Sequence, residues 1–184
     1  MDITKARELV SKYLKDTNNQ LHSRESEVVL RAIAKKLGED EELWGIAGLL
    51  HDLDWEETEN NPEKHGLRTL EILKEEECEV PAEVAHAITA HNEGYTGMKR
   101  ESKLDYSLAA GESITGLIYA YALMRPEKLA GMKASSLNKK FKDRNFAAKV
   151  SRELIADIEK TGLEKSEFFA VAIEAMQTIS DEIF

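Results

Sequence analysis

The chain has 184 residues, of which 42% are hydrophobic and 33% are charged, a composition that suits one folded domain with a substantial core and argues against disorder. Its formal net charge of −10 at pH 7 disfavours nucleic acid as a partner. The sequence has no signal-peptide pattern and no run of about 18 apolar residues, so we expect no membrane partner.

Helical periodicity dominates the sequence, and there is no sustained two-residue alternation, so we predict an all-α fold. In chain order, we expect helices at about 4–15, 21–37, 41–53, 62–77, 80–91, 104–124, 136–141, 144–160 and 163–183. Thr4 is expected to cap the first helix, and Asn18 and Asn19 to separate it from the second. Gly38 and Gly162 are expected directly after helix ends. No repeat, low-complexity tract or linker supports a second domain.

The stretch Gly45–Trp55, which reads GIAGLLHDLDW, places His51 and Asp52 side by side at the end of an apolar helix. His51 follows Ala47 and Leu50 on one helical face, so its imidazole continues a buried stripe. Asp52 lies about 100° further round the helix. We therefore expect one metal ion at the helix end to be within reach of both side chains.

Further histidines lie at helix ends or on apolar helix faces. His22 stands at the N-terminal end of the apolar stripe of the second helix. His91 follows Ile88 on the inward face of its helix and is expected to point inward, whereas His86 is off that face and is expected in solvent. His65 is expected in the first turn of the helix that begins near residue 62.

A carboxylate also falls on an apolar face. Glu112 lies on the apolar side of the long helix over about 104–124, and Asp105, seven residues earlier and close to the same line, is the reserve candidate. Residues 92–102 contain two glycines and are expected to form a loop at the mouth of a site. Imidazole and carboxylate ligands together suit Mn, Fe, Co, Ni or Zn.

The chain thus contains, in order, His22, the pair His51-Asp52 and a late carboxylate. The sequence around and after these residues includes the stretches GLLHDLDWEET, PEKHG, AITAHNEGYTG, ESITGLIYAYALMRPEKL and KKFKDRNFAAKVSRELI. Over about residues 20–180 this pattern resembles the HD-domain superfamily of metal-dependent phosphohydrolases, in particular compact bacterial and archaeal HDIG-type predicted hydrolases. The resemblance implies a single-domain helical bundle, with a metal-binding core at about 20–125 and further C-terminal helices, about 126–184, packed on it.

The resemblance also implies how ligands are divided between metal ions. A first ion would be held by His22, His51, Asp52 and Glu112, the last at a position where family members commonly have Asp. In binuclear members the aspartate of the pair bridges to a second ion, whose other ligands correspond to His65, His91 and Asn92, the last at a position where a further histidine often stands. One or two divalent ions per chain are therefore expected.

Catalytic and substrate-binding residues are predicted from their positions in the chain. Besides Asp52, the carboxylates that could activate or orient a water are Asp54, Glu56 and Glu57. Nine basic residues and two acidic ones between Arg125 and Arg152 give this segment a charge of +7, for which a solvated helix face is the alternative reading. The candidates for binding phosphate are Arg24, Lys64, Arg125, Lys139, Lys140 and Arg144.

We expect a metal-dependent hydrolase of a small phosphate ester, either a nucleotide or another phosphorylated metabolite. Two alternatives stay open, a non-catalytic metal- or nucleotide-binding sensor and a di-iron oxygenase on the same scaffold. The sequence leaves open the substrate, the native metal and whether the protein is a homo-oligomer. Its single cysteine, Cys78, excludes an internal disulfide and fits a reducing cytoplasm, where we expect the protein.

Overall fold

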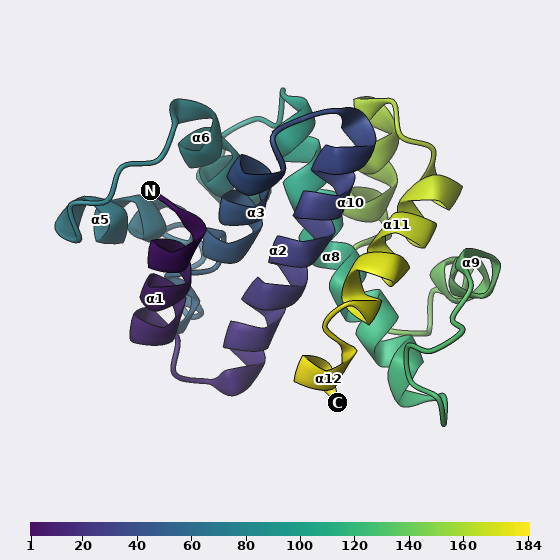
Figure 1. Ribbon diagram of the computed structural model, residues 1–184. Helices are drawn as coiled ribbons and strands as arrows, with labels where there is room; N and C mark the ends of the chain where they lie inside the picture. Colours follow the sequence, from purple (N-terminus) through teal and green to yellow (C-terminus); the bar gives the residue numbers. More distant parts are fainter.

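The computed structural model describes residues 1–184, and its regular structure is entirely helical (Figure 1), so the all-α prediction is confirmed. In chain order the elements are α1 (Ile3–Tyr13), α2 (Thr17–Leu37), α3 (Glu41–Leu50), α4 (Trp55–Thr58), α5 (Leu67–Glu75), α6 (Ala82–His91), α7 (Glu93–Thr96), α8 (Lys103–Leu123), α9 (Ala134–Lys142), α10 (Arg152–Ala156), the 3₁₀ helix η1 (Asp157–Thr161), α11 (Lys165–Gln177) and α12 (Ser180–Ile183).

Two helix starts differ from prediction because aspartates cap them. Asp2, not Thr4, caps α1, since its side chain accepts a hydrogen bond from the backbone N–H of Lys5. Asp16 caps α2 by accepting from the N–H of Asn18. Asn18 therefore lies in the first turn of α2, and the predicted break at this point is wrong.

The turn before α5 departs from the prediction in a way that matters for the site. The helix begins at Leu67 and not at Pro62, so His65 lies in the preceding turn. Gly66 has φ 85°, and a Cβ at this position would meet the carbonyl oxygen of Ile88 at 2.7 Å. Glycine thus lets the turn that carries His65 approach the backbone of α6.

Residues 143–151 form turns where a helix was predicted, and α10 begins only at Arg152. The Arg152 side chain is buried and donates hydrogen bonds to several backbone carbonyls, those of Phe141, Asp143, Phe146, Ala147 and Val150. A guanidinium group has five N–H donors, so one arginine can organise the whole loop. Gly162 follows η1 with φ 91°, as expected, but the predicted last helix is divided into α11 and α12.

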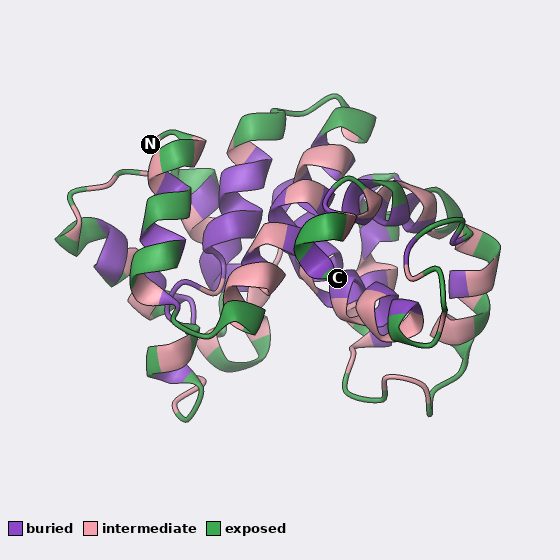
Figure 2. Cartoon of the chain, turned by 60° about the horizontal axis from the view of Figure 1, so that its bottom comes forward, coloured by how far each residue is buried: buried purple, intermediate pink, exposed green.

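The two longest helices, α2 and α8, lie at the centre of the molecule (Figure 1). α2 packs on α3, α8 and α11, and α8 also packs on α6 and α10. A single cluster of 40 buried hydrophobic residues extends from Ala6 to Ile183, and Figure 2 shows buried residues on the inward faces of the helices. Helices from both ends of the chain therefore share one core.

The crossing of α2 and α3 is especially close. A Cβ at Gly48 of α3 would lie 2.6 Å from the backbone carbonyl oxygen of Ser26 on α2. Only glycine permits this approach without a shift of one helix, because no side chain can occupy that space. The crossing matters for the site because Gly48 lies three residues before His51.

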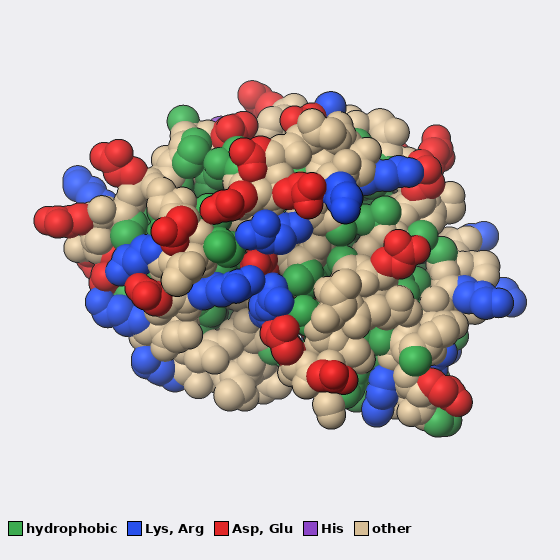
Figure 3. Space-filling model, in the orientation of Figure 1, with side chains coloured by type: hydrophobic (Ala, Val, Ile, Leu, Met, Phe, Trp, Pro, Cys, Tyr) green, Lys and Arg blue, Asp and Glu red, His purple; other side chains and the backbone are tan.

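The outer surface is polar and mixed in charge. Figure 3 shows acidic and basic side chains next to one another over one face, with hydrophobic groups between them. None of the helices combines the length and hydrophobicity needed to cross a membrane.

Candidate metal centre

Five segments of the chain bring the predicted ligands together. The ligand-bearing positions are His22 on α2, His51 and Asp52 at the end of α3, His65 in the turn before α5, His91 at the end of α6, and Glu112 on α8. Except for His51, which is buried, these residues line a cavity of about 560 Å³ together with Asn92.

Asp52 lies at the centre of the group. Its Oδ1 is 3.3 Å from Nε2 of His51, 3.2 Å from Nε2 of His65 and 3.5 Å from Nε2 of His91. Its Oδ2 is 3.7 Å from Nε2 of His22. The imidazoles form two pairs, with Nε2–Nε2 distances of 3.3 Å for His22 and His51 and 3.0 Å for His65 and His91. One carboxylate therefore faces four ring nitrogens.

The backbone sets the tautomer of two of these imidazoles. Nδ1 of His51 lies 2.8 Å from the carbonyl oxygen of Gly48, and Nδ1 of His91 lies 2.5 Å from that of Ile88. A carbonyl can only accept, so each Nδ1 carries the hydrogen. In the neutral ring, Nε2 then presents a lone pair toward Asp52.

Side chains set the other two tautomers. Nδ1 of His65 lies 2.9 Å from Oδ1 of Asp54, and a carboxylate accepts. Nδ1 of His22 lies 3.2 Å from Oγ1 of Thr115, whose own hydrogen is donated to the backbone carbonyl of Glu112. Both Nδ1 atoms must therefore donate, which leaves Nε2 as an acceptor when the ring is neutral.

Four acceptor nitrogens around a carboxylate are an arrangement that calls for a cation. Two groups of ligand atoms each lie within 4.8 Å of one another, namely His22, His51 and Asp52, and Asp52, His65 and His91. Asp52 belongs to both groups. Mixed imidazole and carboxylate donors, each imidazole oriented through its second nitrogen, suit divalent transition-metal ions.

The pKa shifts of the group reflect burial and the negative charge of Asp52. Burial lowers the pKa of His22 to about 4, which keeps this ring in its ligand form. Burial would raise the pKa of Asp52, but His51 and its neighbours outweigh this effect and hold the pKa well below its usual range. Burial also opposes the charge on His65, yet hydrogen bonds to Asp52 and Asp54 raise its pKa to about 9, so a metal ion at this ring would have to displace the Nε2 proton. Asp52 is therefore an ionised carboxylate in a setting that attracts positive charge.

Of the two late carboxylates considered as ligands, Glu112 lies at the site and Asp105 does not. Oε2 of Glu112 is 4.0 Å from Nε2 of His22, its Oε1 accepts from the hydroxyl of Ser113, and burial raises its pKa to about 7. Asp105 is fully buried at the start of α8 and pairs with Nδ1 of His86 at 3.1 Å. The reserve assignment to Asp105 is thus wrong, and His86 is paired instead of free in solvent.

Asp54, predicted as a catalytic carboxylate, is fully buried and turned away from the cavity. Its oxygens accept from Nδ1 of His65 at 2.9 Å, from the N–H of Gly66 at 2.7 Å and from the N–H of Thr69 at 3.1 Å. Because Asp54 is buried and does not line the cavity, it cannot orient a water there. Its position is that of a residue that holds His65 in place.

Glu56 and Glu57, the other predicted catalytic carboxylates, also lie away from the cavity. Glu56 accepts hydrogen bonds from the backbone N–H groups of Lys15 and Asp16, where it links α4 to the start of α2. Glu57 is exposed and pairs with Arg68 at 2.8 Å. Closeness to Asp52 in sequence misled the prediction, because both residues lie in α4, where their side chains contact other segments of the chain.

Asn92 lines the cavity, but its amide nitrogen is already engaged. It donates to the backbone carbonyls of Pro62 at 2.7 Å and His65 at 3.2 Å. The side chain therefore links the end of α6 to the turn that carries His65. This places Asn92 beside the ligands in a supporting position.

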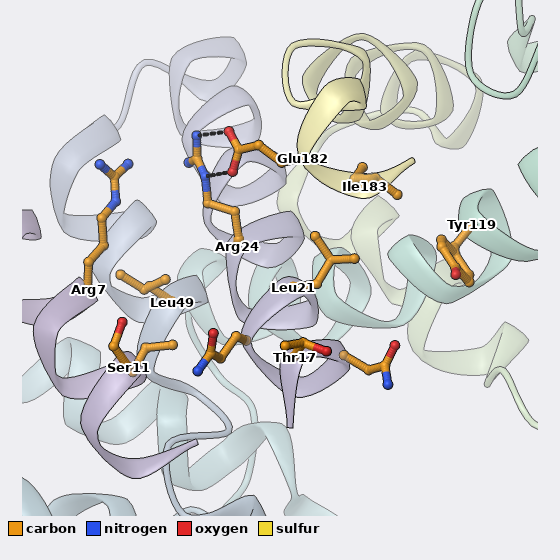
Figure 4. A pocket seen from close by; sticks show the side chains of 12 residues that line it. Arg7, Ser11, Thr17, Leu21, Arg24, Leu49, Tyr119, Glu182 and Ile183 are labelled. Atoms are coloured by element: carbon orange, nitrogen blue, oxygen red, sulfur yellow. Dashed lines mark hydrogen bonds and ion pairs between the residues drawn. The ribbon is translucent and has the colours of Figure 1, made fainter. Parts of the chain in front are cut away.

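The six basic residues predicted to bind phosphate do not line the cavity of the histidines. Four of them contact other parts of the chain. Arg24 pairs with Glu27 and Glu182, and Arg144 pairs with Glu153. Arg125 donates to the carbonyl of Ala130, and Lys140 lies over the rings of Tyr121 and Phe146. Lys64 and Lys139 are exposed. Figure 4 shows Arg24 with Glu182 in a separate cavity of about 680 Å³.

One lysine that the sequence analysis did not single out does reach the site. Lys149 is exposed and lines the cavity, together with Val150 and Ser151. These residues belong to the loop that Arg152 organises through its carbonyl contacts. Lys149 lies in the basic segment, but helical periodicity could not identify it because this part of the chain is not helical.

The fold and the site define an all-α protein with a candidate two-metal centre shared by one aspartate. The family model described as HD domain matches residues 21–143, more than half of the chain, and the chain therefore belongs to the HD-domain family. HD domains are typically metal-dependent hydrolases that bind divalent metal ions. Neither the search of curated proteins nor the search of solved structures found a match.

Proposed function

We propose that the protein is a metal-dependent hydrolase of a small phosphate ester, a nucleotide or another phosphorylated metabolite. The observation that carries this proposal is the orientation of four imidazoles, each held through Nδ1, with Nε2 directed at a shared carboxylate. His22, His51, Asp52 and Glu112 would hold one divalent ion. Asp52, His65 and His91 would hold the second.

Divalent ions in such a site supply Lewis acidity and a water that is nucleophilic near neutral pH. The chain supplies the orientation of the ligands and the contacts to the ester. Lys149 is the only lysine or arginine that lines the cavity, and it would be the basic residue that binds a phosphate oxygen. Ser151 lines the same cavity and adds a hydroxyl donor, whereas the Ser113 hydroxyl already donates to Glu112. A cavity of about 560 Å³ suits a small ligand better than a polymer.

The donor set is compatible with Mn, Fe, Co, Ni or Zn, with one or two ions per chain. The partner in this proposal is a small phosphorylated molecule and not a nucleic acid or a membrane. The unpaired Cys78 is compatible with a reducing compartment, and we place the protein in the cytoplasm as part of the same proposal.

Elemental analysis of protein purified without chelator or affinity-tag metal tests the centre directly. We expect close to two equivalents of metal per chain, loss of metal in an Asp52→Asn variant because the bridging charge is removed, and phosphate release from small esters only by the loaded wild type. Glu57→Gln is the matched control, because Glu57 is an exposed carboxylate paired with Arg68 outside the cavity.

The alternatives give different results. Absence of metal, with no uptake of Mn, Fe, Co, Ni or Zn, would overturn the proposed metal centre. Metal binding without phosphate release would favour a sensor, and metal-dependent oxygen consumption would favour an oxygenase.

A further inference from the structure

The lysines and arginines between residues 125 and 152 differ from those of the rest of the chain in their surroundings. Of these nine residues only Arg144 forms an ion pair with a carboxylate, whereas twelve of the sixteen lysines and arginines elsewhere do. Arg152 is buried among backbone carbonyls, and Lys149 lines the cavity of the histidines. The other six cations have no ion pair within the chain and are Arg125, Lys128, Lys133, Lys139, Lys140 and Lys142.

Exposed apolar side chains lie among these cations at the end of α8. Leu123 is 53% exposed, Met124 is 61% exposed and Phe184, at the C-terminus, is 45% exposed. Nζ of Lys140 is 3.8 Å from Sδ of Met124. Nζ of Lys128 lies 5.2 Å from the centre of the Phe184 ring. The six cations and these three apolar residues therefore form one surface, the α8–α9 surface, at the end of the molecule where α8 ends beside α9 (Figure 1).

We propose that the α8–α9 surface binds a protein partner through a segment in which apolar residues are interspersed among acidic ones. The carboxylates of such a segment would neutralise the six cations, and its apolar side chains would cover Leu123, Met124 and Phe184. The only acidic residues between positions 125 and 152 are Glu127 and Asp143, so the charge of the surface stays positive. The inference does not depend on the proposed function, because no residue of the surface lines the cavity of the histidines.

The surface favours a protein segment over other anionic partners. A small anion is bound in a concave site, and none of the six cations lines any of the larger cavities. A nucleic acid is an extended polyanion, and the rest of the chain, which is strongly negative, would repel it. Arg125 and Lys140 lie over the ring of Tyr121, at 5.7 and 5.5 Å from its centre. Cations held in this way suit discrete carboxylates better than a diffuse lipid surface.

Fluorescence anisotropy with two short labelled peptides tests the inference on the full chain. One peptide consists of Glu with interspersed Leu, and in the other Ser replaces each Leu. We expect the Glu–Leu peptide to bind more tightly and added salt to weaken its binding. The paired variant Lys128→Gln with Lys140→Gln should raise its Kd about tenfold. Met124→Ser should raise the same Kd about fivefold and leave that of the Glu–Ser peptide unchanged.

The matched control is Lys35→Gln with Lys74→Gln, which removes the same charge at exposed lysines outside the surface. It should leave the Kd close to that of the wild type. Absence of binding by the wild type, equal weakening in the two paired variants, or equal affinity for the two peptides would overturn the inference. Tighter binding of phosphatidylserine vesicles or of an oligonucleotide than of the Glu–Leu peptide would also overturn it. Metal content and phosphate release, recorded separately, are expected to match the wild type in every variant.

Discussion

At the scale of single residues, the ligands are oriented by their second ring nitrogens. His51 and His91 use the same local device, since each ends a helix and donates from Nδ1 to the carbonyl three residues earlier. Carbonyls in the last turn of a helix have no intrahelical partner and are free to accept. His65 and His22 lie elsewhere in their elements and depend on side chains instead, those of Asp54 and Thr115.

Asp54→Asn tests this dependence for His65. The two oxygens of the Asp54 carboxylate accept hydrogen bonds from three N–H groups, whereas asparagine has only one acceptor oxygen. The imidazole of His65 therefore loses its fixed orientation in the variant. We expect metal binding by the group of His65 and His91 to weaken by about 10–100-fold, with the His22 group retained. Titration with Mn against a chromophoric chelator measures both. Two unchanged affinities would show that Asp54 does not position the ligand.

At the scale of elements, the site depends on how closely α2 and α3 approach. Gly48 on α3 lies against the backbone of Ser26, one turn along α2 from His22. The same glycine supplies the carbonyl that orients His51. Helix packing and ligand geometry are therefore linked at one position.

Gly48→Ala should separate the two helices, because the added methyl group would meet the Ser26 carbonyl oxygen at 2.6 Å. We expect the free energy of unfolding in urea to fall by about 1–3 kcal/mol, as in other overpacked cores, and metal affinity to fall with it. Gly94→Ala is the control, since no atom lies within 4 Å of its Cβ position. Similar losses in the two variants would contradict a specific role for the crossing.

At the scale of the whole molecule, the candidate centre joins segments that are far apart in sequence. Its ligands come from α2, α3, the turn before α5, α6 and α8, between residues 22 and 112. A metal ion that binds this arrangement binds the folded chain and not the unfolded one. Metal occupancy should therefore contribute to the stability of the entire core.

Removal of metal by a chelator is expected to lower the thermal unfolding midpoint of the wild type. At a free metal concentration of about 100 Kd, binding contributes about 2.7 kcal/mol, which corresponds to a shift of about 5–10 °C for a chain of this size. Differential scanning calorimetry with and without chelator measures the shift, and Asp52→Asn should show none. A wild type that is insensitive to chelator would argue against a metal that stabilises the fold.

The sequence by itself determined the helical fold class and the inward positions of three polar residues at the site. Helical periodicity is local, so the inward positions of His51, His91 and Glu112 could be deduced from their neighbours along the chain. The resemblance of the ordered motifs indicated the HD-domain family, to which the chain belongs. These conclusions needed no knowledge of how the helices pack.

Only the tertiary structure decided which way other side chains are directed. Asp54 follows Asp52 closely in sequence, yet its oxygens are turned to buried N–H groups, while the more distant Lys149 lies in the cavity wall. Glu25 is one of two acidic residues of α2, and both are buried in the folded chain. Such placements depend on contacts between segments remote in the chain, and helical periodicity carries no information about those contacts.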